Sequence, residues 1–210
     1  MGKKFVITIA RGFGSGGKEI AGLIANKLGI NCHEHSILTL ASGLSGLDRS
    51  HFANADEKLI KPNLLNSIKE TFSTDSEGRF ISNDDLFGFE AQIMRGLAAS
   101  ECCVIVGKAA DYVLKDFDNV FSFYIEAPRA YCLKNVMRKM EVTEQEANEL
   151  ITKTDKYRAD FYKHVTGGNY WTNPVNYDLT LNSEKVGKEN CVDIIVNYVK
   201  MRLAENEEQK

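Results

Sequence analysis

The sequence predicts an α/β fold in which a parallel sheet carries helices on both faces. Three observations support this class: unbroken apolar runs typical of buried parallel strands, helical spacing of apolar residues between those runs, and a length of 210 residues that suits one domain. We expect a single domain over residues 1–204, followed by a frayed, charged tail at residues 205–210.

The first element is a strand that begins near residue 5 and ends in a glycine-rich loop. Four glycines and a lysine follow the strand: Gly12, Gly14, Gly16, Gly17 and Lys18. Glycines let backbone N–H groups turn toward an anion, and the N-terminus of the following helix adds partial positive charge. The spacing Gly12-x-x-x-x-Gly17-Lys18 is that of a phosphate-binding loop, so the sequence predicts a P-loop NTPase fold. The alternative is a tight strand-to-helix turn that binds nothing.

The residue after Lys18 departs from the phosphate-loop pattern. Glu19 stands where Ser or Thr usually helps to hold Mg²⁺. A carboxylate binds Mg²⁺ directly or through water, but it also repels phosphates, so Glu19 is a candidate metal ligand that needs a cation beside it. We assign the ATP phosphates to the whole loop: Gly12, Gly14, Ser15, Gly16, Gly17, Lys18 and Glu19.

The later elements follow in order along the chain. Helical spacing continues to residue 28 and again over 48–72, and the polar segment 73–83 predicts a hairpin or loop. Helices are expected at 86–99 and 187–203, and strands at 102–106, 120–125 and 177–182. Between them, 129–165 forms two charged helices divided near residue 142, where Thr143 and Glu146 make a capping box. This helical pair is the expected lid.

The ends of the predicted strands indicate where a ligand binds. In an open parallel sheet, ligands lie beyond the carboxyl ends of the strands. Lys108, which follows the second strand, and the residues after Ile125 should therefore face the same cleft as the glycine-rich loop.

Composition excludes some classes of function. The chain is 43% apolar and 26% charged with a formal net charge of −3, which argues against nucleic-acid or anionic-membrane binding through net charge. No apolar run of about 18 residues is present, and the start leads into a strand rather than a signal-peptide core. Five cysteines without paired C-x-x-C spacing indicate reduced thiols. A cytoplasmic location is expected.

Several motifs in register resemble one family. They are ITIARGFGSGGKEIA, the DEK at 56–58, VIVGKAADYVL, ITKTDKYRADFY and NPVNYDLTLNSEKVG. From about Phe5 to Leu203 the chain resembles the cytidylate kinase-like proteins of the P-loop nucleoside-monophosphate kinase group. The resemblance implies transfer of the γ-phosphoryl group of ATP, with Mg²⁺, to a small-molecule acceptor, with CMP or dCMP the first candidates.

The resemblance also implies roles for particular residues. Lys18 and the lid arginines Arg138 and Arg158 would stabilise the moving phosphoryl group. Asp155 and Arg158 match an Asp-x-x-Arg motif in which the aspartate binds the acceptor nucleoside and the arginine binds its phosphate. Lys108 stands where relatives have an arginine that contacts the acceptor.

Two further positions are candidates with a less regular match. Relatives commonly read Tyr-Asp-Arg near the first acceptor contact, whereas this chain has His33-Glu34-His35 followed by Ser36, which we take as an acceptor contact in an altered pocket. Asp111 is a candidate for holding Mg²⁺ through water.

Other interpretations stay open. The departures at Glu19, Lys108 and 33–35 are compatible with a nucleotide-binding regulator without activity, and the fold also suits a P-loop kinase of another small acceptor, such as a sugar or a shikimate-like acid. Asp155 and Arg158 alternatively form a surface ion pair, and Lys108 is alternatively a solvated loop residue. His33 and His35 alternate as metal ligands would, with Cys32 or Glu34 nearby, but no distant pair with matching spacing completes such a site.

Overall fold

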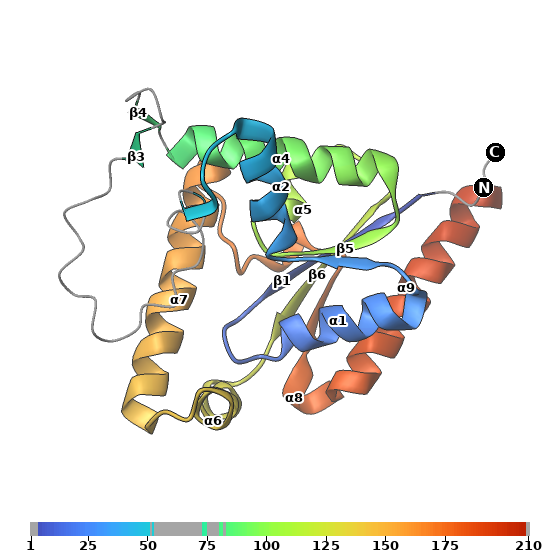
Figure 1. Ribbon diagram of the computed structural model, residues 1–210. Coiled ribbons are helices and arrows are strands. Elements are labelled where there is room, and N and C mark those ends of the chain that lie inside the picture. The colour runs from blue at the N-terminus through green and yellow to red at the C-terminus, as the bar shows by residue number, and fades with distance from the viewer. Residues whose placement is uncertain (1–3, 51, 53–72, 75–79, 82, 209–210) are drawn as a thin grey trace.

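The computed structural model of this chain describes residues 4–50, 52, 73–74, 80–81 and 83–208. Within them, one parallel sheet has the strand order β2-β5-β1-β6-β7 (Figure 1). Its strands are β1 (Val6–Arg11), β2 (Asn31–His33), β5 (Cys103–Val106), β6 (Val120–Glu126) and β7 (Leu179–Asn182). The predicted α/β class is confirmed, and the expected strands at 102–106, 120–125 and 177–182 are present with bounds shifted by two residues at most.

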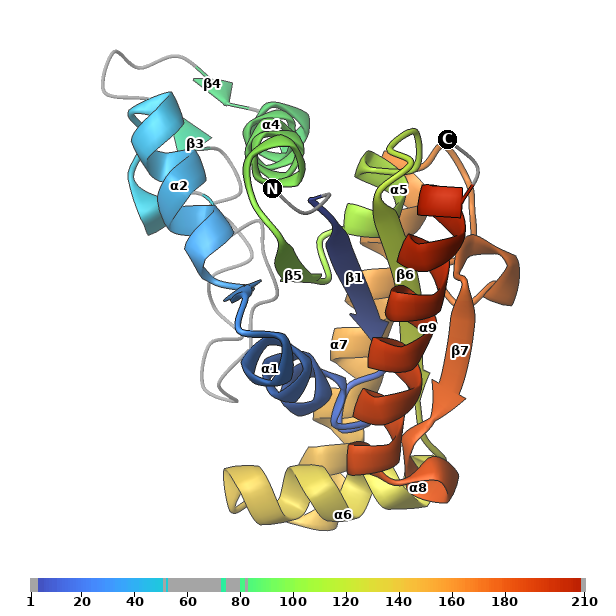
Figure 2. The same ribbon diagram turned by 90° about the vertical axis from the view of Figure 1, so that its right-hand side faces the viewer.

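Helices cover both faces of this sheet (Figure 2). On one face lie α1 (Gly17–Leu28) and α9 (Lys188–Glu208), with the short α8 (Ser183–Val186) before α9. On the other face lie α2 (Ser36–Ser45), α4 (Asn83–Ser100) and α5 (Ala110–Val113). Both long helices predicted around 86–99 and 187–203 are therefore found.

The alternation of side chains along β1 produces these two layers. Ile7 and Ile9 are fully buried against α1 and α9, whereas Val6 faces the core under α4 and α5. Successive side chains of a strand point to opposite faces, so a strand covered on both faces is mostly apolar, and the buried hydroxyl of Thr8 is satisfied by donating to Ser122 Oγ at 2.9 Å. The largely apolar strand before the glycine-rich loop therefore lies at the centre of the sheet, and the loop follows its carboxyl end.

The expected helical pair at 129–165 consists of α6 (Arg129–Met140) and α7 (Glu144–Val165). The predicted capping box is present: Thr143 Oγ1 accepts from the Glu146 backbone N–H at 3.3 Å, and Glu146 Oε2 accepts from the Thr143 N–H at 2.9 Å. From α6, Asn135 Nδ2 donates to Gly14 O at 2.9 Å. This contact holds α6 beside the glycine-rich loop; that the pair moves as a lid stays a prediction.

Two expectations fall partly outside the described residues. The antiparallel pair β3 (Ser73–Thr74) and β4 (Phe80–Ile81) agrees with the hairpin expected at 73–83. The helical interpretation of 48–72, with the DEK motif, lies almost wholly outside the described part of the chain.

At the C-terminal end, α9 continues to Glu208, so the backbone of 205–208 is helical where a frayed tail was expected.

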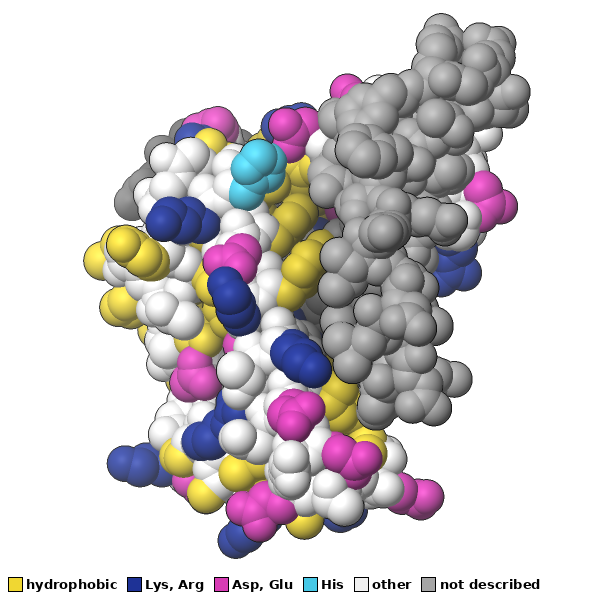
Figure 3. Space-filling model, turned by 90° about the vertical axis from the view of Figure 1, so that its left-hand side faces the viewer, with side chains coloured by type: hydrophobic (Ala, Val, Ile, Leu, Met, Phe, Trp, Pro, Cys, Tyr) yellow, Lys and Arg dark blue, Asp and Glu magenta, His cyan; other side chains and the backbone are white. Residues whose placement is uncertain are grey.

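The surface over α7 carries charges of both signs (Figure 3). Lys153 lies 3.8 Å from Glu149, and Lys156 lies 2.7 Å from Asp160, each pair one helical turn apart. Pairs of this kind cancel locally, so this face does not present a field of one sign. Among the described helices, none is both long and apolar enough to cross a membrane.

Candidate active site

The glycine-rich loop connects β1 to α1 and has the backbone of a phosphate-binding loop. Gly14 and Gly16 both have φ of 85°, in the region that favours glycine. A Cβ atom on Gly14 would lie 2.7 Å from the backbone oxygen of Cys132, so the close approach of α6 also requires glycine there. Ser15 is fully buried, and its Oγ accepts from the Gly17 N–H at 3.3 Å. Its hydroxyl therefore shapes the loop.

The loop forms one wall of a cavity of about 460 Å³. The other walls come from Glu34 and His35 after β2 and from residues of α6, including Asn135 and Lys139. Lys18 reaches across this cavity, with its Nζ 2.5 Å from Glu34 Oε2 and 3.4 Å from His35 Nε2. We refer to this space as the loop cavity.

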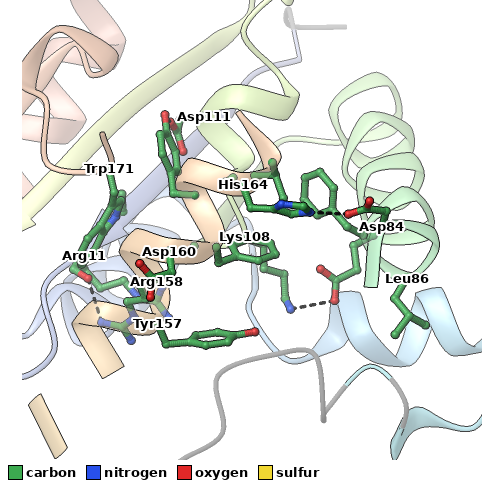
Figure 4. A pocket seen from close by; sticks show the side chains of 18 residues that line it. Arg11, Asp84, Leu86, Lys108, Asp111, Tyr157, Arg158, Asp160, His164 and Trp171 are labelled. Atoms are coloured by element: carbon green, nitrogen blue, oxygen red, sulfur yellow. Dashed lines mark hydrogen bonds and ion pairs between the residues drawn. The ribbon is translucent and has the colours of Figure 1, made fainter. Parts of the chain in front are cut away.

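A second cavity, of about 310 Å³, lies between α4 and α7 and shares lining residues with the first; Figure 4 shows its lining side chains. Aromatic side chains contribute to its walls, among them Phe87, Phe161 and Trp171. Acidic groups also line it, among them Asp84, which lies 2.7 Å from the ring nitrogen of His164. We refer to this space as the aromatic cavity.

Three cations line both cavities: Arg11, Lys108 and Arg158. Their side chains are 8%, 5% and 9% exposed, so they are held within the protein rather than solvated. Arg158 Nη1 donates to the backbone oxygen of Arg11 at 3.0 Å, and Lys108 Nζ lies 3.2 Å from Glu90 Oε1 (Figure 4). Positive charge fixed before a substrate binds stabilises a phosphoryl group without reorganisation cost. The junction of the two cavities is therefore suited to phosphate.

The turn that carries Lys108 has an unusual backbone. Gly107, Lys108 and Ala109 have φ of 75°, 57° and 51° in succession. A Cβ atom on Gly107 would lie 2.3 Å from Arg11 Nη1, so glycine leaves room for the guanidinium. Left-handed conformations at the other two residues cost on the order of 1 kcal/mol each. This strained backbone places the Lys108 side chain at the junction of the two cavities.

The residues predicted to contact the acceptor are only partly brought together. Lys108 and Arg158 meet at the junction. Asp155 lines neither cavity; its Oδ1 accepts from the Phe13 N–H at 2.8 Å and lies 3.4 Å from Arg158 Nη1. Ser36 is exposed and its Oγ lies 2.9 Å from His33 Nδ1, away from both cavities. The structure therefore gives Asp155 a role in holding the glycine-rich loop, and it does not bring Ser36 to the junction.

Arg138, the other predicted lid arginine, lies outside both cavities. Arg138 is exposed on α6 and lines neither cavity, whereas its neighbour Lys139 lines the loop cavity. Helical geometry explains the difference, because adjacent residues point about 100° apart around a helix. Of these two cations, only Lys139 lies at the loop cavity, and its side chain is half exposed.

The two candidate metal ligands lie in different cavities. Glu19 lines the loop cavity, where Lys188 and Lys139 lie 2.6 Å and 2.9 Å from its Oε2 and lower its pKa to about 2. Asp111 lines the aromatic cavity and accepts from Tyr162 Oη at 2.6 Å, and burial raises its pKa to about 6. The structure therefore does not join them in one magnesium site, and Glu19 obtains the cation that it needs from two lysines.

Two charged residues of the cavities, Arg11 and Glu90, were not singled out from the sequence, and Glu34 was named there without its contact to Lys18. Arg11 carries a readable signal, because it is a charged residue that ends an otherwise apolar strand just before the glycine-rich loop. Glu34 lies 3.7 Å from Arg11 and 2.5 Å from Lys18, contacts that need the end of β2 and the loop to meet in space. Glu90 accepts from Lys108 Nζ although 18 residues separate them in the chain, and no local sequence pattern indicates this contact.

Comparison with known proteins decides the family. The cytidylate kinase-like family matches residues 6–185. The chain belongs to the cytidylate kinase-like family. Membership and the P-loop kinase fold support phosphoryl transfer to a small substrate. A search of curated proteins found no match.

Solved structures with the same fold include one from Eubacterium ventriosum ATCC 27560 described as an uncharacterized protein, with a TM-score of 0.70, 23% identity, and 94% and 99% of the two chains covered. A shikimate kinase from Bacteroides thetaiotaomicron matches with a TM-score of 0.53, 11% identity, and 93% and 98% coverage. A gluconokinase from Sinorhizobium meliloti 1021 matches with a TM-score of 0.50, 12% identity, and 100% and 97% coverage. At these identities the matches show the fold alone.

Proposed function

We propose that this cytidylate kinase-like protein transfers the γ-phosphoryl group of ATP to a nucleoside monophosphate, with CMP and dCMP the first acceptors to test. One observation carries the proposal: Arg11, Lys108 and Arg158 line both the loop cavity and the aromatic cavity. A phosphoryl group that passes between donor and acceptor must cross such a junction, and its charge needs cations on both sides.

The two cavities differ in the ligand that they suit. The loop cavity offers backbone N–H groups and Lys18 to a triphosphate. The aromatic cavity offers flat apolar walls to a base and acidic groups to its polar edges, with the three cations at the end where the acceptor phosphate would lie. ATP in the first cavity and a monophosphate in the second would bring both phosphate groups to the same place.

Magnesium accompanies ATP in reactions of this class, and Glu34 is our candidate to hold it. Mg²⁺ is usually bound through one or two carboxylates together with phosphates and water. The cations beside Glu34 are Lys18 and Arg11, which bound phosphates would themselves engage, releasing its carboxylate. Glu19 instead keeps its lysine partners on α6 and α9. The ion would neutralise negative charge that develops on the phosphate groups during transfer.

A kinase of a hydroxyl-bearing acceptor is the second candidate. Glu34 places a carboxylate next to Lys18 and Arg11, where it repels an acceptor phosphate but accepts a proton from an acceptor hydroxyl. Glu90 partly neutralises Lys108 in the same region. The fold neighbours include a shikimate kinase and a gluconokinase, and both shikimate and gluconate are hydroxy acids.

An acceptor panel separates these functions. The protein is incubated with Mg-ATP labelled on its γ-phosphorus and either CMP, dCMP, UMP, AMP, GMP, shikimate or gluconate, and the labelled product is identified. A labelled pyrimidine diphosphate supports the first candidate, and a labelled phosphate monoester of a hydroxy acid supports the second. ATP binding without transfer to any acceptor would overturn both and favour a nucleotide-binding regulator. Arg138→Ala serves as the matched control, because its side chain is exposed outside both cavities.

A further inference from the structure

Three side chains with metal-binding atoms meet at the edge of the sheet, and none of them lines either cavity. His33 ends β2, Glu101 precedes β5, and Cys103 begins β5. One ligand atom from each, a ring nitrogen, a carboxylate oxygen and the sulfur, lie within 4.8 Å of one another. The parallel pairing of Asn31 with Cys103 brings these groups together, although 68 residues separate His33 from Glu101. This pairing supplies the distant partners that the local sequence around His33 lacks.

Hydrogen bonds from outside the cluster orient its members. Ser36 Oγ lies 2.9 Å from His33 Nδ1, so Nε2 faces Glu101 Oε1 at 2.8 Å. Asn31 Nδ2 donates to the second oxygen of Glu101 at 2.6 Å. In metal sites, the far atom of each ligating imidazole or carboxylate is usually held in this way, which fixes the near atom toward the ion.

The burial of the cluster leaves access from one side. Cys103 is fully buried, the His33 side chain is 12% exposed, and the Glu101 side chain is 30% exposed. An ion bound between them would have protein on the side of the sulfur and solvent on the side of the carboxylate. Three protein ligands with one open position for water is a familiar arrangement for zinc.

We propose that His33, Glu101 and Cys103 form a binding site for a divalent transition-metal ion of the Zn²⁺ type. Imidazole and thiolate donors favour such an ion over Mg²⁺, which prefers oxygen ligands, so the site is chemically distinct from any magnesium bound with ATP. Binding forms a metal–sulfur bond and releases the thiol proton to solvent. The inference is independent of which acceptor the kinase uses.

The proposed metal site is next in sequence to a residue of the loop cavity. His33 directly precedes Glu34, whose carboxylate lies 2.5 Å from Lys18 Nζ. A metal ion on His33 would fix the end of the short edge strand from which Glu34 projects. We therefore expect metal occupancy to raise the thermal stability of the protein.

Cobalt provides the test, because thiolate-bound Co²⁺ absorbs in the near ultraviolet. The metal-free full chain is titrated with Co²⁺ and then with Zn²⁺ as competitor. We expect one equivalent of Co²⁺ to produce the thiolate absorption, and one equivalent of Zn²⁺ to abolish it and to raise Tm. Absence of thiolate absorption in the native protein would overturn the proposal.

Variants locate the site. Cys103→Ser should remove the absorption and His33→Ala should weaken binding by about tenfold or more, while Asn31→Ala, which removes only an outer contact, should weaken it by about tenfold. The matched controls are Cys102→Ser, adjacent in the chain, and Cys191→Ser, buried on the other face of the sheet, and both should bind as the native protein does. Circular dichroism checks folding; if Cys103→Ser does not fold, His33→Ala decides. Unchanged binding in His33→Ala, or loss in Cys102→Ser, contradicts the assignment.

Discussion

The Nζ atom of Lys18 lies 2.5 Å from Oε2 of Glu34, inside the cavity that the glycine-rich loop encloses. The lysine that would hold the nucleotide phosphates is thus paired with a carboxylate of the protein. His35 Nε2 lies 3.5 Å from the same carboxylate and 3.4 Å from Lys18. Phosphates entering the cavity would compete with Glu34 for this cation.

The first prediction concerns this competition. Glu34→Gln should tighten the binding of ATP without Mg²⁺ by about two- to fivefold, because the Lys18 side chain is 64% exposed and such pairs contribute up to about 1 kcal/mol. Turnover should fall by about 100-fold or more, since the variant loses the carboxylate for Mg²⁺ or for proton transfer. Calorimetry measures the first effect and labelled-phosphate transfer the second. Glu149→Gln on the exposed side of α7 is the control, and unchanged turnover in Glu34→Gln would exclude either role.

The second prediction concerns Arg158. Arg158→Ala should raise the KM of the acceptor by about 10- to 100-fold, as expected for loss of a charge-assisted contact, with a smaller effect on ATP. Steady-state kinetics with each substrate varied in turn provides the measurement. Arg138→Ala should leave both constants near the native values. Equal losses for both substrates would place Arg158 in a general structural role, through its bond to the Arg11 backbone.

The third prediction is a pH dependence from Asp111. Burial raises its pKa from 3.8 to about 6, against the opposing effect of the Tyr162 hydrogen bond. Stability from this group is full below pH 3.8 and is lost as pH rises through 6. The Asp111→Asn variant has no carboxylate to ionise and therefore does not lose this stability. The free energy of unfolding of the variant minus that of the native protein should rise between pH 4 and pH 7, by at most about 3 kcal/mol. Urea unfolding at several pH values tests this, and a difference independent of pH would contradict it.

The fourth prediction has the opposite sign and concerns Glu19. Hydrogen bonds from Lys188 and Lys139 lower its pKa from 4.5 to about 2. Its contribution is present above pH 4.5 and is lost as pH falls through 2. Glu19→Gln should therefore flatten the decline of Tm between pH 4.5 and 2. Glu141→Gln, an exposed residue just after α6, is the control and should keep the native slope.

The sequence predicted the local features of this protein well because each depends on neighbouring residues. The apolar run of β1, the glycine-rich loop and the capping box at Thr143 and Glu146 are all set within a few positions. For the same reason the family resemblance, which rests on several such motifs, is confirmed over residues 6–185.

The site was only partly predictable because its contacts join distant residues. Which cation of α6 lies at the loop cavity depends on the rotation of the helix, and the sequence alone does not distinguish Arg138 from Lys139, which lines it. Asp155 was assigned to the acceptor, whereas its bond to Phe13 spans 142 residues. The positive φ of Lys108 and Ala109 likewise arises from tertiary packing that no local pattern specifies.

The most direct test of the phosphoryl-transfer account is the Lys18→Ala variant in the labelled-transfer assay. Lys18 is 64% exposed, so the variant should keep the native circular dichroism spectrum and Tm. We predict that the native protein labels one acceptor of the panel and that Lys18→Ala, folded and at equal concentration, labels none above background. Native-level transfer by Lys18→Ala would show that the glycine-rich loop is not where the reaction takes place.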